Sequence, residues 1–348
     1  RRVLFRSGIW IEPEMVCEDS DLYREHPDWA FTIPGRKPVR ARYQLVLDYS
    51  RKEVVDGIFT QIAKVLDETK ADYVKMDMNR HLTDVWSKTE GEQNQGAILH
   101  RYMLGVYDFL ERLHERYPAL LIEGCSGGGG RFDAGMLYYT PQIWCSDNTD
   151  AIERVKIQYG TSFAYPSCTV GSHVSAVPNH QTERTTELAT RAAVAMAGSF
   201  GYELDLNLLT EEEKEQVRAQ IKNYHRFEML IRQGRYYRLT DVWQKKEYAA
   251  WEYCRPDGSE ALVTVVTLNT QCNPATEYVK LRGLGEDKKY RVEVVGMQTG
   301  GENGQRINGT PNAVEPEYYT GAQLVYAGVP VPRLGNEYKS WQVYVKEV

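Results

Sequence analysis

The sequence predicts a partial (β/α)8 barrel, comprising strands 3–8 of the eight, followed by a C-terminal antiparallel β-sandwich. Short apolar runs alternate with amphipathic helical patterns over roughly the first two-thirds of the 348 residues, which favours parallel strands joined by right-handed crossovers. Polar or glycine-rich residues follow each apolar run, as they do at the carboxyl ends of barrel strands. After about residue 235, strand patterns follow one another with no long helix between them.

The composition is that of an ordinary globular chain, with 42% hydrophobic and 26% charged residues. A net charge of -6 gives no electrostatic footprint for nucleic acid, and no apolar run approaches the roughly 18 residues that a membrane span needs. The six cysteines form no CxxC pair and the seven histidines show no HExxH spacing. We therefore expect reduced thiols, no metal, no nucleic acid and no membrane partner.

The first seven residues, RRVLFRS, lack an initiator methionine and a signal-peptide pattern. They resemble the translation of a sequencing-adaptor oligonucleotide, so we expect residues 1–7 to be non-native and the natural protein to continue upstream. The remaining chain is expected to divide into the partial barrel, residues 8–235, and the C-terminal domain, residues 236–348.

The predicted elements of the barrel alternate in order along the chain. Strands are expected at residues 8–12, 73–80, 120–123, 142–144, 174–177 and 200–204. Helices are expected after Ser50, at 95–117, 150–165 and 182–197, and after Thr210. Ser50 with Glu53, and Thr210 with Glu213, have the spacing of a capping box.

In the C-terminal part, turn residues such as Pro256-Asp257-Gly258 separate the strand patterns. Strands are expected at residues 248–253, 260–268, 277–281, 290–295 and 341–345. Residues 298–337 are rich in Gly, Asn and Pro and are expected to form a long irregular excursion.

The second predicted strand ends in a group of functional side chains. If the run stays extended, Lys75, Asp77 and Asn79 share one face. A carboxylate between an ammonium and an amide at a strand end suits a binding or catalytic site, although a salt-bridged strand terminus without chemistry is an equal alternative. A second carboxylate, Asp147, follows the fourth predicted strand.

Alternate barrel strands contribute to the same interior layer, so Asp77 and Asp147 can face one another across the barrel mouth. Two carboxylates about 5–5.5 Å apart are the arrangement of a retaining glycosidase. Lys75 should keep Asp77 ionised, as a nucleophile requires. The neighbouring charge of Asp150 and partial burial favour Asp147 as the general acid. Asp150 is itself an alternative acid, but its place before a helical pattern favours a helix N-cap.

Further candidates follow the other strands. The glycine-rich run 124–130 matches no phosphate-binding motif and suits close backbone approach to a small polar ligand. Cys125 lies in this run without a neighbouring base, which disfavours a nucleophilic thiol. Trp10 suits stacking on a sugar, with an ordinary core tryptophan as the alternative, and Arg42 suits hydrogen bonding to hydroxyls, with a solvated surface arginine as the alternative. For His180 a structural role is favoured over one in lining the pocket.

Six segments in order carry a resemblance to a known family. They are GIWIEPEMV (8–16), YVKMDMNRHLTD (73–84), EGCSGGGGRFD (123–133), IWCSDNTDAIERVKIQYGTS (143–162), HVSAVPNHQT (173–182) and FGYELDL (200–206). Together they resemble a bacterial α-galactosidase of glycoside hydrolase family 36, and they cover nearly the whole barrel portion.

The resemblance implies hydrolysis of terminal α-linked galactose from melibiose- or raffinose-type oligosaccharides by double displacement. It implies that Asp77 is the nucleophile and Asp147 the acid/base. It further implies that galactose is held by residues at six positions, with no metal and no cofactor. These are Trp10, Arg42, Lys75, Asn79, Cys125 and Gly127.

The resemblance also sets limits and leaves alternatives. Met76 stands where the family is associated with Trp. The family's N-terminal domain and first two barrel strands have no counterpart here, so inactivity of this chain by itself is an alternative that stays open. A galactosyltransferase of the raffinose-synthase kind, an α-N-acetylgalactosaminidase and a non-catalytic carbohydrate-binding fragment stay open. We expect the intact protein to be a homo-oligomer and, from the cysteine pattern, to be cytoplasmic.

Overall fold

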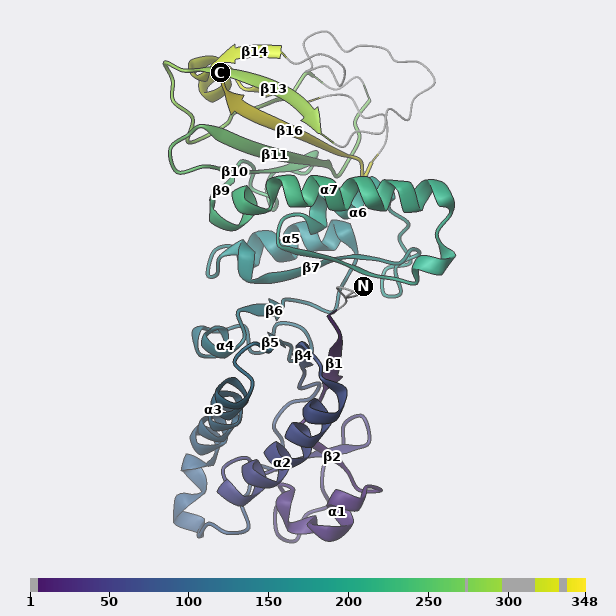
Figure 1. The fold of residues 1–348 in the computed structure, drawn as a ribbon, viewed down its shortest axis with the longest axis vertical. Helices are drawn as coiled ribbons and strands as arrows, with labels where there is room; N and C mark the ends of the chain where they lie inside the picture. Colours follow the sequence, from purple (N-terminus) through teal and green to yellow (C-terminus); the bar gives the residue numbers. More distant parts are fainter. Residues whose placement is uncertain (1–5, 273–274, 296–316, 332–336) are drawn as a thin grey trace. The chain divides into compact units, whose positions relative to one another are not determined.

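The computed structural model describes residues 6–272, 275–295, 317–331 and 337–348 (Figure 1). The chain divides into two compact units, residues 1–147 and residues 148–348. Each unit has its own apolar core.

The first unit is built on a parallel sheet with strand order β1-β4-β5-β6. Its strands are β1 (Gly8–Ile11), β4 (Tyr73–Met76), β5 (Leu121–Gly124) and β6 (Gln142–Trp144). Ile11 lies opposite Met76, and Met76 lies opposite Gly124. The residues that follow these strands therefore share one edge of the sheet, as predicted for the carboxyl ends of parallel strands.

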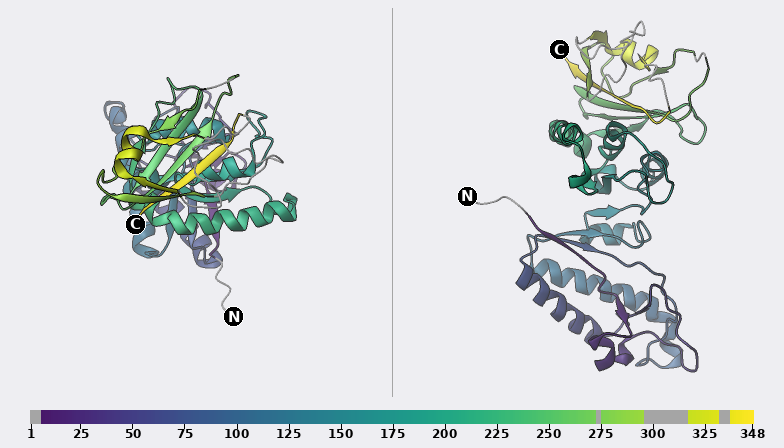
Figure 2. Two further views of the ribbon diagram at one scale, coloured as in Figure 1. Left: turned by 90° about the horizontal axis from the view of Figure 1, so that it is seen from above. Right: turned by 90° about the vertical axis from the view of Figure 1, so that its right-hand side faces the viewer.

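Two long helices cover this sheet. α2 (Lys52–Thr69) and α3 (Ile98–Arg116) lie side by side in Figures 1 and 2. Apolar residues at helical spacing on both helices join the strands in one core because period 3.6 places them on a single face. The members from the helices and strands include Val54, Ile58, Phe109, Leu110, Val74 and Ile122.

The first unit also differs from expectation at the start of α2. Arg51, not Ser50, occupies the N-cap position and makes no side-chain capping bond. The Ser50 hydroxyl bonds to buried Asp48, and Glu53 pairs with Arg51 at 2.8 Å. The predicted capping box therefore does not form, because two stronger charged partners take its members.

Short elements that the sequence patterns did not predict complete this unit. They are β2 (Met15–Cys17), β3 (Gln44–Val46), α1 (Asp21–Glu25), α4 (Ala134–Tyr139) and 3₁₀ turns at Pro27–Trp29 and Glu92–Ala97. Each spans six residues or fewer, too short to show a periodic pattern.

The second unit begins with alternating helices and strands. They are α5 (Ala151–Thr161), β7 (Val170–Ser175), α6 (Leu188–Ala195), β8 (Ser199–Glu203) and α7 (Glu211–Gln233), with β7 parallel to β8. The capping box of Thr210 and Glu213 is confirmed at the start of α7. The strand predicted at 174–177 begins earlier, at Val170, and the helix predicted from 182 begins only at Leu188.

The C-terminal strands form an antiparallel sheet of order β14-β13-β16-β11-β10-β9. Its strands are β9 (Arg235–Arg238), β10 (Tyr248–Cys254), β11 (Glu260–Thr267), β13 (Lys289–Val295), β14 (Glu317–Thr320) and β16 (Ser340–Glu347). One face packs against helices that include α7, which crosses it in Figure 1. The other face packs against a two-stranded sheet of β12 (Tyr278–Val279) and β15 (Val329–Pro330), so both faces of β10 are buried.

The expected irregular excursion at 298–337 is wrong for its described part. Residues 317–331 contain β14, a short π-helix (Gln323–Ala327) and β15, whereas residues 298–316 and 332–336 lie outside the described residues. Among the described helices, none combines the length and the apolar character that crossing a bilayer would require.

Candidate active site

Asp77 lies directly after β4, at the edge of the sheet where the parallel strands end. Its backbone N–H donates to the carbonyl of Ile11 at 2.9 Å, which continues the pairing of β4 with β1 for one more residue. The side chain is buried, 6% exposed. The strand thus delivers the carboxylate to a fixed position at the carboxyl edge.

Both oxygens of the Asp77 carboxylate accept hydrogen bonds. Oδ1 accepts from the backbone N–H groups of Met78 at 2.8 Å and Gly127 at 3.3 Å. Oδ2 accepts from the indole Nε1 of Trp10 at 3.2 Å and from Nδ2 of Asn79 at 2.7 Å. Four N–H donors from three segments therefore hold the carboxylate in one orientation, which is what a preorganised reacting group needs.

The glycine-rich loop after β5 approaches both predicted catalytic aspartates. Gly127 (φ +53°) donates its N–H to Asp77. Gly128 (φ +82°) packs so closely that a Cβ there would lie 2.9 Å from Cα of Ser146 and 3.0 Å from the nitrogen of Asp147. The positive φ and the close approach explain the glycines, and the loop places Asp77 and Asp147 at the same end of the sheet.

Asp147 follows β6 and its side chain is exposed. The indole Nε1 of Trp144 donates to its Oδ1 at 3.1 Å. The sequence predicts partial burial of Asp147 as the general acid, but the exposed position of its side chain does not support the predicted burial. The carboxylate is instead held at the sheet edge by a buried tryptophan of its own strand.

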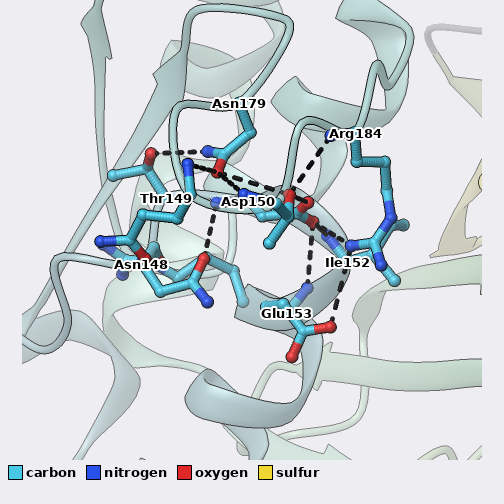
Figure 3. A network of polar contacts seen from close by, with 10 residues as sticks. Asn148, Thr149, Asp150, Ile152, Glu153, Asn179 and Arg184 are labelled. Atoms are coloured by element: carbon cyan, nitrogen blue, oxygen red, sulfur yellow. Dashed lines mark hydrogen bonds and ion pairs between the residues drawn. The ribbon is translucent and has the colours of Figure 1, made fainter.

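Asp150 has the structural role favoured by the sequence. It is the N-cap of α5, and its Oδ1 accepts from the N–H groups of Ile152 at 2.8 Å and Glu153 at 3.2 Å (Figure 3). Arg184 donates to it at 2.7 Å, and the hydroxyl of Thr182 bonds to Oδ2. Burial favours the neutral acid, but these hydrogen bonds outweigh it and hold the pKa of Asp150 below its usual value.

The same network fixes the loop after β7. Asn179 accepts from the N–H groups of Gln181 and Thr182 and donates to Thr149 at 3.0 Å, as Figure 3 shows for the Asn179–Thr149 pair. Residues 179–184 therefore form a hydrogen-bonded loop. Because these residues are held outside a helix, α6 starts later than its sequence pattern predicts.

Lys75 has a different partner from the one expected. Its Nζ lies 3.4 Å from Oε1 of Glu123, its direct neighbour on β5, and 4.5 Å from the ring centroid of Trp144. The expected pairing with Asp77 is thus replaced by a buried carboxylate and an aromatic face. Lys75 remains at the carboxyl end of the sheet, with its ammonium over the ring of Trp144 in β6, the strand that precedes Asp147.

Comparison with known proteins gives these residues a family. The Melibiase family model matches residues 2–234, and the model of the glycosyl hydrolase family 36 C-terminal domain matches residues 248–345. The bifunctional alpha-galactosidase/sucrose kinase AgaSK of Mediterraneibacter gnavus is 55% identical over 98% of this chain. This chain belongs to glycoside hydrolase family 36.

Solved structures agree with this family 36 assignment. AgaA of Geobacillus stearothermophilus, as a doubly substituted variant in complex with raffinose, superposes with a TM-score of 0.90 at 44% identity over 99% of this chain. The galactosidase domain of AgaSK superposes with a TM-score of 0.88 at 54% identity. The predicted fold class, a partial (β/α)8 barrel followed by an antiparallel β domain, is thereby confirmed.

The chain spans less than half the length of these relatives. It covers 33% of AgaSK and 44% of Alpha-galactosidase AgaA, and 44–45% of the chains in their solved structures.

Cys125 of this family 36 chain is a buried thiol beside the predicted nucleophile. Burial, and next the charge of Asp77, raise its pKa to about 12. The thiol is therefore neutral at ordinary pH. This state opposes a nucleophilic thiol, and the predicted contact of Cys125 with galactose stays a prediction.

Arg42 and Trp10 converge on the same edge. Arg42 reaches Glu12 with an Nη1–Oε1 distance of 3.1 Å, and half-exposed Trp10 bonds to Asp77. Glu12 was not among the predicted site residues. The pairing of β1 with β4 could have revealed it, because Glu12 follows Ile11 as Asp77 follows Met76. His180 lies in the second unit, in the bonded loop 179–184.

Within the described residues there is no cluster of three or more His, Cys, Asp or Glu side chains suited to a metal ion.

Proposed function

We propose that the protein containing this chain is a retaining α-galactosidase that removes terminal α-linked galactose from raffinose-type oligosaccharides. The observation that carries this proposal is the contact of one loop with both aspartates. Gly127 donates to Asp77, and Gly128 packs against the backbone of Asp147. Two carboxylates at one sheet edge are the group pair that glycoside hydrolysis uses.

The names of the relatives support the substrate class. AgaA variants were crystallised in complex with raffinose and with stachyose. These two variants carry aspartate substitutions whose positions in that enzyme differ by 70. Asp77 and Asp147 are also 70 residues apart in this sequence, which supports their assignment as the pair on which turnover depends.

The proposed mechanism is double displacement. An oxygen of Asp77 attacks the anomeric carbon, and Asp147 donates a proton to the glycosidic oxygen as that C–O bond breaks. Asp147, now a carboxylate, then takes a proton from water, whose oxygen attacks the anomeric carbon from the face opposite Asp77 as the bond between that carbon and the Asp77 oxygen breaks. Galactose leaves with its original anomeric configuration, and both carboxyl groups return to their starting states.

The test uses azide rescue in the full-length gene product with p-nitrophenyl α-galactoside. Asp77→Ala should lower kcat by about 1,000-fold or more, and added azide should restore turnover with β-galactosyl azide as the product, because azide then attacks the substrate directly. Asp147→Ala should give α-galactosyl azide, because the galactosyl–Asp77 intermediate still forms.

Asp72→Asn is the matched control, since Asp72 is an exposed aspartate just before the same strand, β4. It should leave turnover unchanged. If Asp77→Ala retained activity without azide, or if both alanine variants gave the same azide anomer, the assigned roles would be wrong.

A further inference from the structure

Glu12 joins two predicted galactose-binding side chains that come from different segments. It follows β1 directly, and its side chain is 10% exposed. Its Oε1 accepts from Nδ2 of Asn79 at 2.7 Å and lies 3.1 Å from Nη1 of Arg42. One carboxylate oxygen therefore contacts an amide from the segment after β4 and a guanidinium from the loop before β3.

The contact with Glu12 determines how the amide of Asn79 faces. A side-chain amide nitrogen has two hydrogens. Nδ2 of Asn79 lies 2.7 Å from Oδ2 of Asp77 and 2.7 Å from Oε1 of Glu12, so each carboxylate takes one of them. With the Glu12 acceptor removed, one of these hydrogens would lose its partner and the amide could turn.

Arg42 needs a similar restraint. Its side chain is 53% exposed, and both Arg42 and Tyr43 have positive φ, +53° and +61°, which costs free energy for residues other than glycine. The backbone of this loop is anchored by Arg80, which donates to the carbonyls of Val39, at 3.3 Å, and Gln44. The backbone is therefore fixed, and Glu12 fixes the direction of the exposed guanidinium.

We propose that Glu12 is a positioning residue that orients Arg42 and Asn79 to receive the hydroxyl groups of a terminal galactose. This proposal rests on the proposed function. Glu12 takes no part in proton transfer or in nucleophilic attack. It sets the geometry of the sugar-binding groups, so its loss weakens ground-state and transition-state binding alike and raises KM more than it lowers kcat.

The test is Glu12→Gln in the full-length gene product, assayed with p-nitrophenyl α-galactoside. Glutamine keeps the shape and one acceptor oxygen but loses the charge that holds Arg42. We expect KM to rise about tenfold, since a charge-assisted contact is lost, while kcat changes by less than about threefold and the melting temperature stays within about 2 °C.

Double-mutant cycles separate positioning from a general structural effect. If Glu12 acts through Arg42, Glu12→Gln should have little further effect on KM in the Arg42→Ala background. In the Asn79→Ala background, the part of the KM increase that acts through Asn79 should likewise disappear. Independent effects that multiply in both backgrounds would overturn the proposal, as would a fall in kcat with unchanged KM.

The chain offers a matched control in Glu18. It pairs with Arg40 of the same loop, with Nη2 2.9 Å from Oε1, and contacts no predicted site residue in the described structure. Glu18→Gln removes an Arg–Glu pair two residues from Arg42 and should leave KM unchanged. If it raised KM as much as Glu12→Gln, loop stability and not orientation by Glu12 would be responsible.

Failure of the proposed function has a different outcome. If wild-type full-length protein neither hydrolysed the galactoside nor bound galactose by calorimetry, both proposals would fall. If wild type hydrolysed it and the cycles were multiplicative, only the role of Glu12 would fall. Calorimetric titration with galactose checks the result independently of turnover, with the Kd of Glu12→Gln expected to rise about as much as KM.

Discussion

At the scale of single residues, the candidate site depends on side chains that lie next to one another only after the strands align. Lys75 illustrates this. Asp77, two residues further along the chain, is the partner that the sequence predicts. Side chains at positions i and i+2 of a strand point the same way without meeting, whereas the side chain opposite on the neighbouring strand lies directly beside Lys75. The neighbour on β5 is Glu123, and it takes the ion pair.

This pairing predicts two separable effects of Lys75. Lys75→Met leaves the Glu123 carboxylate, 4% exposed, without its cation, so the free energy of unfolding should fall by on the order of 3 kcal/mol. Adding Glu123→Gln should restore most of that stability, because the uncompensated charge is gone. KM for the galactoside should stay raised in the double variant if Lys75 also binds the sugar. Denaturant unfolding and steady-state kinetics measure the two effects.

The outcome that contradicts this interpretation is a double variant as unstable as Lys75→Met. In that case Glu123 would not be the partner that Lys75 compensates. Recovery of both stability and KM in the double variant would instead mean that Lys75 has no contact of its own with the substrate.

At the scale of elements, the loop 124–130 is the part that makes the site possible. Its glycines allow close approach to other backbone segments of the protein, and not only to a phosphate or another ligand. Gly128 meets Ser146 and Asp147, and a Cβ on Gly129 would lie 2.7 Å from the carbonyl oxygen of Cys145. The loop can lie this close to the strand end at β6 only without side chains.

Gly128→Ala should therefore abolish most activity. Its φ of +82° is unfavourable for alanine, and the added Cβ would displace the backbone that carries Asp147. We expect kcat/KM to fall at least about 100-fold, because a displacement of about 1 Å can cost that much. Gly160→Ala in α5 is the control, since its Cβ would meet nothing within 4 Å and activity should not change.

The strand β10 carries a second feature with a measurable consequence. Glu252 is fully buried, and its Oε2 accepts from the N–H of Arg282 at 2.8 Å, whereas Oε1 has no hydrogen-bond partner. Burial raises the pKa of Glu252 to about 8, and the contact with Arg282, which lowers the pKa, offsets only part of this rise. The carboxyl group is therefore protonated in the folded protein at neutral pH.

The sign of the resulting pH dependence follows from linkage. The folded pKa lies above the unfolded one, so between about pH 4.5 and about pH 8 the folded state holds a proton that the unfolded state has lost. The contribution of Glu252 is complete below this window and declines as pH rises through it. Between pH 5 and pH 8, the melting temperature should decrease less with rising pH in Glu252→Gln than in the wild type. Equal slopes of melting temperature against pH in the two proteins would contradict the prediction.

At the scale of the whole molecule, the apolar cores divide with the two units. One core cluster lies within residues 11–143, and three further clusters lie within residues 151–345. No cluster of described residues combines members of both units. Separate cores are the usual condition for separate cooperative units.

Calorimetry of this 348-residue chain should therefore show two unfolding transitions. Glu252→Gln should change the pH dependence of only one, that of the second unit, and Lys75→Met should lower only the other. A single transition shifted by both substitutions would show that the units unfold together. The homo-oligomeric state and the cytoplasmic location stay predictions, which sedimentation and fractionation of the natural protein can test.

Much of this organisation was predictable because it is local. Alternating apolar runs and helical patterns predicted six parallel strands in order, and β6 begins and ends where expected. The capping boxes show the limit. Thr210 caps α7 at an exposed helix end, whereas Ser50 has the same spacing but is bonded to buried Asp48, a contact that the spacing cannot reveal.

The sequence by itself determined the alternation of strands and helices, the antiparallel C-terminal part and the positions of Asp77 and Asp147 after their strands, because periodicity and turn chemistry act over a few residues. Tertiary structure alone decided that Glu12 joins Arg42 to Asn79, that Lys75 pairs with Glu123 and that Gly128 packs on Asp147. These contacts join residues 19 to 67 positions apart. They depend on strand register and loop path, which only the packed sheet fixes.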